Sequence, residues 1–154
     1  MEQKLSNPLS TAVAKRYSNV LETVRDALKY GRKALAFQPV IQAGAPQNIL
    51  FCKGLIRISD PAGRHIPARD FIAEVENNEL ERLIDCATLQ LGLATLAEQP
   101  DVRVSVNMSA QSIGYPKWEH TLEEGLQRSP NLATNLILKM IENSVMAAPE
   151  VARY

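Results

Sequence analysis

The 154-residue chain lacks a dominant charge, because 17 acidic residues balance its 17 basic ones. This balance gives no reason to expect a nucleic-acid polymer or an anionic membrane surface as partner. The chain also lacks an apolar run of membrane-spanning length and a signal-peptide core. Its only cysteines, Cys52 and Cys86, lie in apolar patterns, so we expect buried free thiols and a cytoplasmic location.

Several catalytic motifs are also absent from the sequence. It has no glycine-rich loop that could cradle a phosphate and no nucleophile elbow. Neither His65 nor His120 has metal-ligand spacing to another histidine or to a cysteine, so we expect both on the surface. These absences argue against a P-loop hydrolase, an α/β-hydrolase and a metal site built on histidine or cysteine.

The order of the expected elements indicates an α/β domain. Residues 1–16 are polar and contain Pro8, which predicts a flexible tail. Apolar residues at helical spacing predict helices over 17–33, 67–75, 80–96 and around 118–126. Short apolar runs predict strands over 34–41, 49–59, 102–107 and 136–142. A short turn makes the first two strands antiparallel, whereas the later alternation of strand and helix favours parallel pairing.

Two of the expected strands end on side chains that carry oxygen. The stretch 102–109 alternates valine with polar residues, so we expect Val102, Val104 and Val106 to face helices. Its polar face ends at Asn107, and the apolar stretch 136–142 ends at Glu142. Such strand ends are typical of the site-bearing rim of an α/β barrel and suit a metal or phosphate site. Only about four strands are visible, whereas a closed barrel needs eight, so the predicted fold is a partial (β/α) TIM-type barrel.

Five short motifs occur in an order that carries a family resemblance. They are FQPV at 37–40, KGLIR at 53–57, residues 67–75, SVNMS at 105–109 and MIENS at 140–144. On these motifs, residues 17–154 resemble the amino-terminal half of an EAL domain. That family hydrolyses the bacterial messenger cyclic di-GMP with magnesium or manganese ions, which activate the attacking water.

The resemblance implies a role for several residues of this chain. Asn107 and Glu142 would be metal ligands, and Arg57 would hold a phosphate of the nucleotide. Gln38 and Leu55 would line the nucleotide pocket. The residues themselves leave other roles open: Asn107 could cap a turn, Glu142 could be an acidic residue at a helix start, and Arg57 could pair with Asp60 or Asp70.

The chain departs from the family pattern at the metal site. Lys53 replaces the glutamate of the signature tripeptide, Lys139 replaces an acidic residue, and Ile141 replaces a threonine. A unit positive charge about 4 Å from a divalent ion is unfavourable by roughly 8 kcal/mol at an effective dielectric of 20, unless the lysine snorkels toward solvent. The later family motifs, an Asp-Asp pair, a catalytic lysine and the general-base glutamate, are absent from the sequence.

The sequence therefore supports two hypotheses of different classes. The first is a catalytically inactive EAL-like regulatory module, without a cofactor, that acts through a protein partner or through weak binding of cyclic di-GMP. The second is the amino-terminal fragment of a phosphodiesterase that would use magnesium or manganese. An open sheet edge after residues 136–142 also predicts a homo-oligomer.

Overall fold

The structure, a computed structural model, describes residues 8–140, and its strands form one mixed sheet. The strands are β1 (Lys33–Gln42), β2 (Ala45–Ser59), β3 (His65–Pro67), β4 (Val104–Met108) and β5 (Leu136–Met140). The sheet order is β1-β2-β4-β5, and the short β3 pairs with β2. β1 and β2 are antiparallel, whereas β4 is parallel to both β2 and β5. This arrangement confirms the predicted α/β fold class with its antiparallel first pair.

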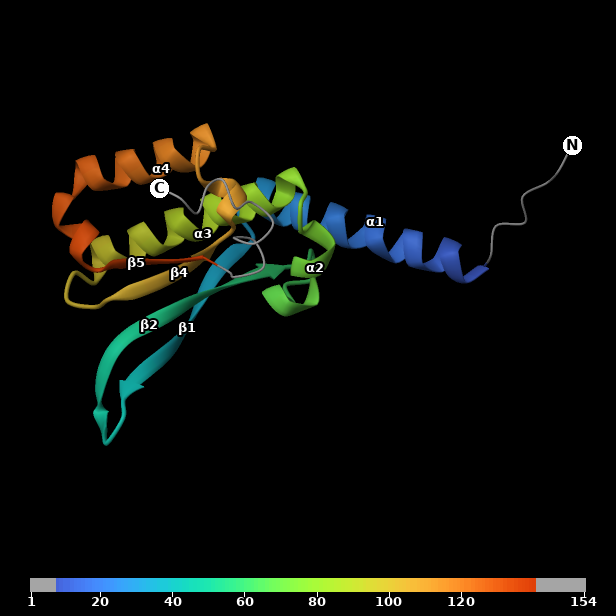
Figure 1. The fold of residues 1–154 in the computed structure, drawn as a ribbon. Coiled ribbons are helices and arrows are strands. Elements are labelled where there is room, and N and C mark those ends of the chain that lie inside the picture. Colours follow the sequence, from blue (N-terminus) through green and yellow to red (C-terminus); the bar gives the residue numbers. More distant parts are fainter. Residues whose placement is uncertain (1–7, 141–154) are drawn as a thin grey trace, which may run out of the picture.

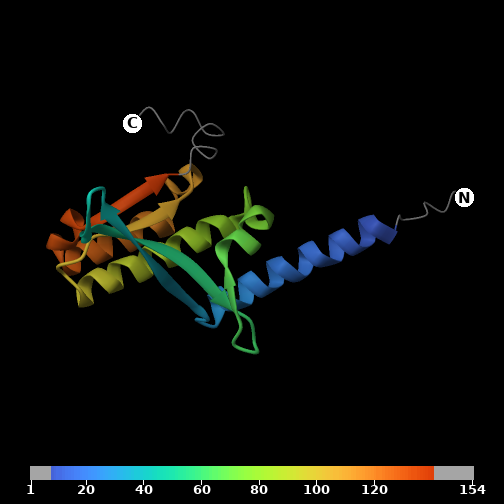
Figure 2. The same ribbon diagram turned by 90° about the horizontal axis from the view of Figure 1, so that it is seen from below.

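The helices lie on one side of the central strands. They are α1 (Pro8–Lys29), α2 (Ile72–Val75), α3 (Glu79–Glu98) and α4 (Pro116–Arg128), with 3-10 turns η1 (Ala68–Asp70), η2 (Ala110–Ser112) and η3 (Pro130–Thr134). α3 and α4 cover one face of β4 and β5, and α1 runs outward from the body (Figure 1). Seen from below, the opposite face of the sheet carries no helix of the described chain (Figure 2). Among the described helices, none combines the length and apolarity needed to cross a membrane.

The first helix begins earlier than the sequence analysis predicts. The sequence predicts a tail over residues 1–16, but α1 starts at Pro8. Proline breaks a helix interior but fits the first turn, where its missing N–H would have no partner within the helix. The helix ends at Lys29, and Gly31 follows with a φ of 72°, the left-handed conformation expected just after a helix.

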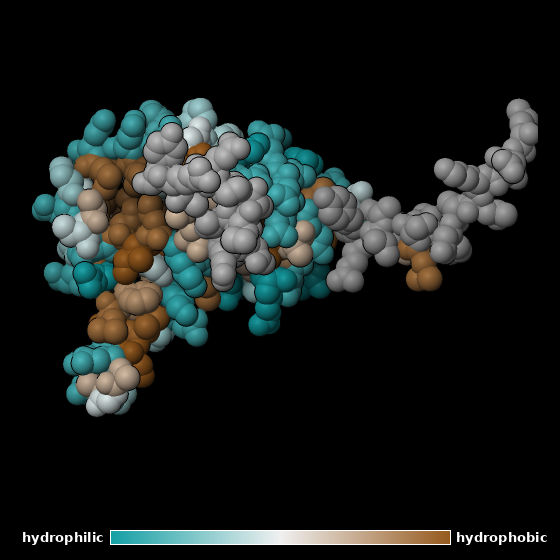
Figure 3. All heavy atoms as spheres, viewed as in Figure 1, coloured by the Kyte–Doolittle hydropathy of each residue, from teal (hydrophilic) through white to brown (hydrophobic). Residues whose placement is uncertain are grey.

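The β1–β2 hairpin is longer than expected and projects from the body. The turn predicted over 42–48 is confined to two residues, and Gly44 has a φ of 80° there. Hydrophobic side chains are exposed along this projecting hairpin (Figure 3), and the large ones include Phe37, Ile41, Ile49 and Leu50. The hairpin thus presents an apolar surface that the described residues do not cover.

Two hydrophobic clusters hold the helices on the sheet, and α3 contributes to both. The first joins α1, α2 and the start of α3 to Ile56 and Ile58 of β2. The second joins the rest of α3 and Trp118 of α4 to Val104 and Val106 of β4. The valines therefore face the helices, as their spacing in the sequence predicts.

A glycine lets α3 approach β4 closely. A Cβ added at Gly92 would lie 2.9 Å from Cγ1 of Val106, a valine that is 1% exposed. Val106 cannot move away easily because its branched side chain is rigid and is packed inside the second cluster.

Gly92→Ala should therefore destabilise the protein, although alanine is the better helix former. Helix propensity favours alanine by about 1 kcal/mol, but overpacking a core costs about 1–3 kcal/mol. We expect chemical denaturation to show a net loss of about 1 kcal/mol. The matched control is Ala94→Gly at an exposed position of α3, which reports propensity alone. A clear gain of stability for Gly92→Ala would contradict the close contact.

Candidate functional site

The strand register brings most of the expected site residues onto one face of the sheet. Gln38 of β1 is the register partner of Lys53 in β2, and Lys53 is the partner of Ser105 in β4. Asn107 lies two residues beyond Ser105 on the same face and pairs in register with Lys139 of β5. This face, opposite the buried valines of β4, is the inner face of the partial barrel.

A cavity lies where β2 and β4 end. Its volume is about 450 Å³, within the range of roughly 300–1,000 Å³ that is typical of small-molecule sites. Leu55, Arg57 and Asn107 line it, together with residues of α2 and α3. Gln38 and Lys53 lie further back along the strands and do not line it. Glu142, the remaining expected site residue, falls outside the described residues.

Arg57 keeps most of its hydrogen-bond donors available. Its Nη1 atom donates to the backbone carbonyl of Ile56 at 3.0 Å. The two carboxylates that the sequence offered as partners are used elsewhere: Asp60 pairs with Arg64 at 2.7 Å, and Asp70 pairs with Arg69 at 3.5 Å. The Arg57 guanidinium, half-buried at the cavity, therefore retains donors suited to an anionic oxygen.

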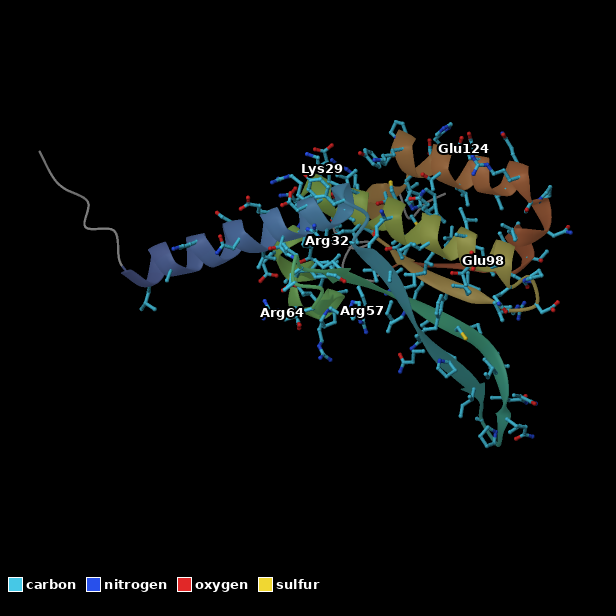
Figure 4. All side chains as sticks on the ribbon, turned by 180° about the vertical axis from the view of Figure 1, so that it is seen from behind. Lys29, Arg32, Arg57, Arg64, Glu98 and Glu124 are labelled. Carbon is cyan, nitrogen blue, oxygen red and sulfur yellow. The ribbon has the colours of Figure 1, made fainter. Side chains whose placement is uncertain are left out.

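Figure 4 shows Arg57 and Arg64 on the same side of the molecule, near the end of β2. The charge on the inner face as a whole is positive. Lys53 is half-buried and Lys139 is exposed, and neither forms an ion pair with a described residue. Asn107 between them is neutral, and it is not among the helix caps found within residues 8–140.

This donor set does not suit a divalent cation. Magnesium and manganese prefer carboxylate and carbonyl oxygens, whereas the inner face offers the amides of Gln38 and Asn107 and the ammonium groups of Lys53 and Lys139. Within residues 8–140, no three acidic, histidine or cysteine side chains converge to form a metal site.

A buried carboxylate of α3 holds the loop that follows Asn107. The Oδ2 atom of Asp85 accepts hydrogen bonds from the backbone N–H of Ser109 at 2.7 Å and from the Ser112 hydroxyl at 2.6 Å. Ser109 in turn caps η2 by accepting a hydrogen bond from the N–H of Gln111 at 3.2 Å. Asp85 thus fixes the chain immediately after Asn107 against α3.

Burial raises the pKa of Asp85 to about 6. The hydrogen bonds from Ser112 and Ser109 act in the opposite direction, and the charge of nearby Glu81 raises the pKa further. Glu81 is also buried and accepts a hydrogen bond from the N–H of Asn77 at 3.0 Å, which secures the start of α3. Both carboxylates line the cavity, so they add negative charge opposite Arg57.

Asp85 and Glu81 are not among the site residues that the sequence predicts. The available signal is that Asp85 interrupts the apolar run from Leu83 to Ala87, at a helix position where an unpaired charge would be costly. Its hydrogen-bond partners are 24 and 27 residues away, so the sequence could indicate the need for a partner but not its identity.

The comparison with protein families identifies the chain. The model of the EAL domain matches residues 21–153, so the chain belongs to the EAL domain family. Among curated proteins, none matches the chain significantly.

Solved EAL domains share this fold. The Xanthomonas citri FimX EAL domain, solved in complex with c-diGMP, has a TM-score of 0.76 and 22% identity, and the match covers 92% of this chain. The Vibrio cholerae LapD S helix-GGDEF-EAL protein gives 0.72 and 14%, and the PaMucR phosphodiesterase gives 0.63 and 24%. Their matches cover 89% and 87% of this chain.

This chain covers only part of each of these proteins. It spans 56% of the FimX chain, 33% of the LapD chain and 56% of the PaMucR chain.

The raised pKa of Asp85 predicts a specific pH dependence of stability. Its carboxyl binds a proton more tightly in the folded protein than in the unfolded chain, where the pKa is near 3.8. The stability that this group contributes is therefore present below pH 4 and is lost as the pH rises toward about 6. Asp85→Asn keeps an acceptor for both serines and removes the titration.

We therefore expect Asp85→Asn to gain stability relative to wild type between pH 4 and pH 7, by up to about 3 kcal/mol. The measurement is the free energy of unfolding in urea at each pH. Asp101→Asn, at an exposed position, is the matched control and should follow the wild-type curve. Parallel curves for wild type and Asp85→Asn would show that burial does not perturb this carboxyl.

Proposed function

We propose that this EAL domain chain is a non-hydrolytic module of cyclic di-GMP signalling that acts through a protein partner. The observation that carries the proposal is the position of Lys53 on the inner face, in register with Gln38 and Ser105. An ammonium group stands where the family resemblance calls for a carboxylate ligand.

A second lysine reinforces the effect of the first. Lys139 pairs in register with Asn107, so lysines occur on the strands on both sides of this amide. Divalent ions and lysines repel each other, and the described residues supply no carboxylate cluster to offset that repulsion. Without a bound ion, a water molecule would lack activation, and no residue of the chain matches the family's general base.

The same face carries side chains that could bind a nucleotide weakly. Arg57 can donate to a phosphate oxygen at the cavity, and Leu55 supplies an apolar wall. The FimX EAL domain with the same fold was solved with c-diGMP bound. A single arginine holds a cyclic dinucleotide only weakly, so the proposed role depends on protein contacts more than on tight nucleotide binding.

Self-association belongs to the same proposal. β5 is the last strand of the sheet order, and no described strand pairs with its outer edge. Leu138 and Met140 of β5 are 39% and 44% exposed, and the projecting hairpin adds further apolar surface. Open edges and apolar patches of this kind favour pairing with a second chain.

Cyclic di-GMP should remain intact in the presence of this chain, with magnesium or with manganese. We expect no turnover for wild type and none for Lys53→Glu, although that substitution should strengthen manganese binding by roughly tenfold. Chromatography of the linear dinucleotide measures turnover, and calorimetry measures metal binding.

The control is Arg103→Glu, which makes the same change of charge at an exposed position. It should alter neither turnover nor manganese binding. Turnover by wild type would falsify the non-hydrolytic proposal. Turnover by Lys53→Glu alone would show that the lysine, and not the missing base, is the decisive defect.

Cyclic di-GMP binding without metal should be weak and should depend on Arg57. A charge-assisted hydrogen bond contributes about 1.5–3 kcal/mol, so Arg57→Ala should lower the affinity by roughly 10- to 100-fold. Arg57→Lys should be intermediate, because it keeps the charge but loses the planar fork of donors. Calorimetry in the presence of a chelator is the measurement, with Arg103→Ala as control. Nanomolar, Arg57-dependent binding would overturn the emphasis on a protein partner.

A further inference from the structure

A second polar surface lies on the other side of α3 from the cavity at Arg57. It is a groove of about 270 Å³ between α1, α3 and α4. Four cations line it: Arg25 and Lys29 of α1, Lys33 of β1 and Lys117 of α4. We call this surface the basic groove. None of its lining residues is acidic.

The four cations are not neutralised within the described chain. The ion pairs found among residues 8–140 involve other basic residues, at positions 64, 69, 120 and 128. Lys29 has an aromatic neighbour instead, since its Nζ atom lies 5.1 Å from the centre of the exposed Tyr30 ring. Because the whole chain has no net charge, these positive charges reflect a local segregation of charge and not a generally basic protein.

Several acidic residues of the surrounding helices line other surfaces. On α1, Glu22 and Asp26 line a different depression together with Arg32. On α3, Glu81 and Asp85 line the cavity at Arg57. On α4, Glu124 pairs with His120 and Arg128. The residues that line the basic groove thus carry positive charge without a carboxylate among them.

The floor of the basic groove is apolar. Leu28 of α1 and Leu80, Leu83 and Ala87 of α3 line it between the cations. Cys86 also lines it, and burial raises the pKa of its thiol, which keeps the group uncharged. An apolar floor with a cationic rim fits a partner that combines an apolar side chain with carboxylates around it.

The size of the groove suits one or two anchoring side chains of a protein partner. Its volume of about 270 Å³ is at the lower end of the roughly 300–1,000 Å³ typical of small-molecule sites. The cavity at Arg57 is larger and lies on the opposite helix face, at positions 81, 84, 85 and 88 of α3. In Figure 4, Lys29 and Arg57 lie on opposite sides of α1. A partner on the basic groove would therefore leave the cavity open.

We propose that the basic groove is the docking site for an acidic, amphipathic segment of another protein. This inference rests on the proposed function only for the expectation that a protein partner exists. The segment would insert an apolar side chain against Leu80 and Leu83 while its carboxylates face Lys29, Lys33 and Lys117. The recognition depends on both charge and apolar burial. A polyanion or an uncharged apolar peptide should therefore bind more weakly than the acidic, amphipathic segment.

The test uses a fluorescein-labelled helical peptide of glutamate, alanine and leucine, with the leucines on one face. Fluorescence anisotropy with the full chain should show salt-sensitive binding. Lys29→Glu/Lys117→Glu should weaken it at least about tenfold. The matched control, Lys15→Glu/Arg103→Glu, has the same net charge with both changes outside the groove and should bind within about twofold of wild type.

Three further measurements separate the alternatives. Amide chemical-shift changes upon titration should map to α1, α3 and α4 around the groove and not to residues 53–57. A peptide with serine in place of leucine should bind at least about tenfold more weakly. A single-stranded RNA probe should bind more weakly than the acidic peptide.

Several outcomes would overturn the docking site: no binding at millimolar peptide, equal effects of the two double variants, equal binding of the serine peptide, or tighter binding of the RNA. These results leave the proposed function untouched, because hydrolysis of cyclic di-GMP is measured separately and does not involve the groove. Conversely, turnover by wild type would end the non-hydrolytic proposal and leave the groove result standing.

Discussion

The contact between α3 and β4 is the constraint on which the rest of the structure depends. Gly92 allows the helix to approach Val106, and the Asp85 carboxylate holds the backbone of Ser109 and the hydroxyl of Ser112. The first contact sets the distance between helix and sheet, and the second sets the position of the chain after the strand. Because β4 lies between β2 and β5, its position also sets the register of the inner face.

That register explains why Lys53 and Lys139 affect the chemistry of the inner face. Cross-strand neighbours in a sheet lie about 4.5–5.5 Å apart, so a side chain on β2 acts on the groups opposite it in β4. Lys53 opposite Ser105 and Lys139 opposite Asn107 give this face a positive charge that is unfavourable for a divalent cation. The same positive charge is compatible with an anionic phosphate near Arg57. This is the physical basis of the proposed non-hydrolytic function.

α3 also separates the two surfaces for which we propose functions. Helical periodicity directs Glu81 and Asp85 toward the cavity, whereas Leu80 and Leu83 face the basic groove. The cavity is walled partly by buried carboxylates and the groove by exposed cations, so the two surfaces differ in charge as well as in position. A single amphipathic helix, packed on both sides, is sufficient to keep them apart.

The sequence by itself determined the strands, most of the helices and the parallel and antiparallel pairings, because these depend on local periodicity and on the length of connections. It also predicted that the valines of β4 face the helices, and its motifs predicted the family. It did not determine that Pro8 begins α1, because proline is compatible with either a break or a first turn.

Only the tertiary structure decided which polar groups meet. The partners of Asp85 lie 24 and 27 residues further along the chain, and the fold brings Lys117 of α4 beside the groove cations of residues 25–33. Arg57 had two possible acidic partners in the sequence, and both pair with other arginines in the fold. Such contacts depend on how helices pack on a sheet, and packing is set by the shape of the whole core rather than by any local pattern.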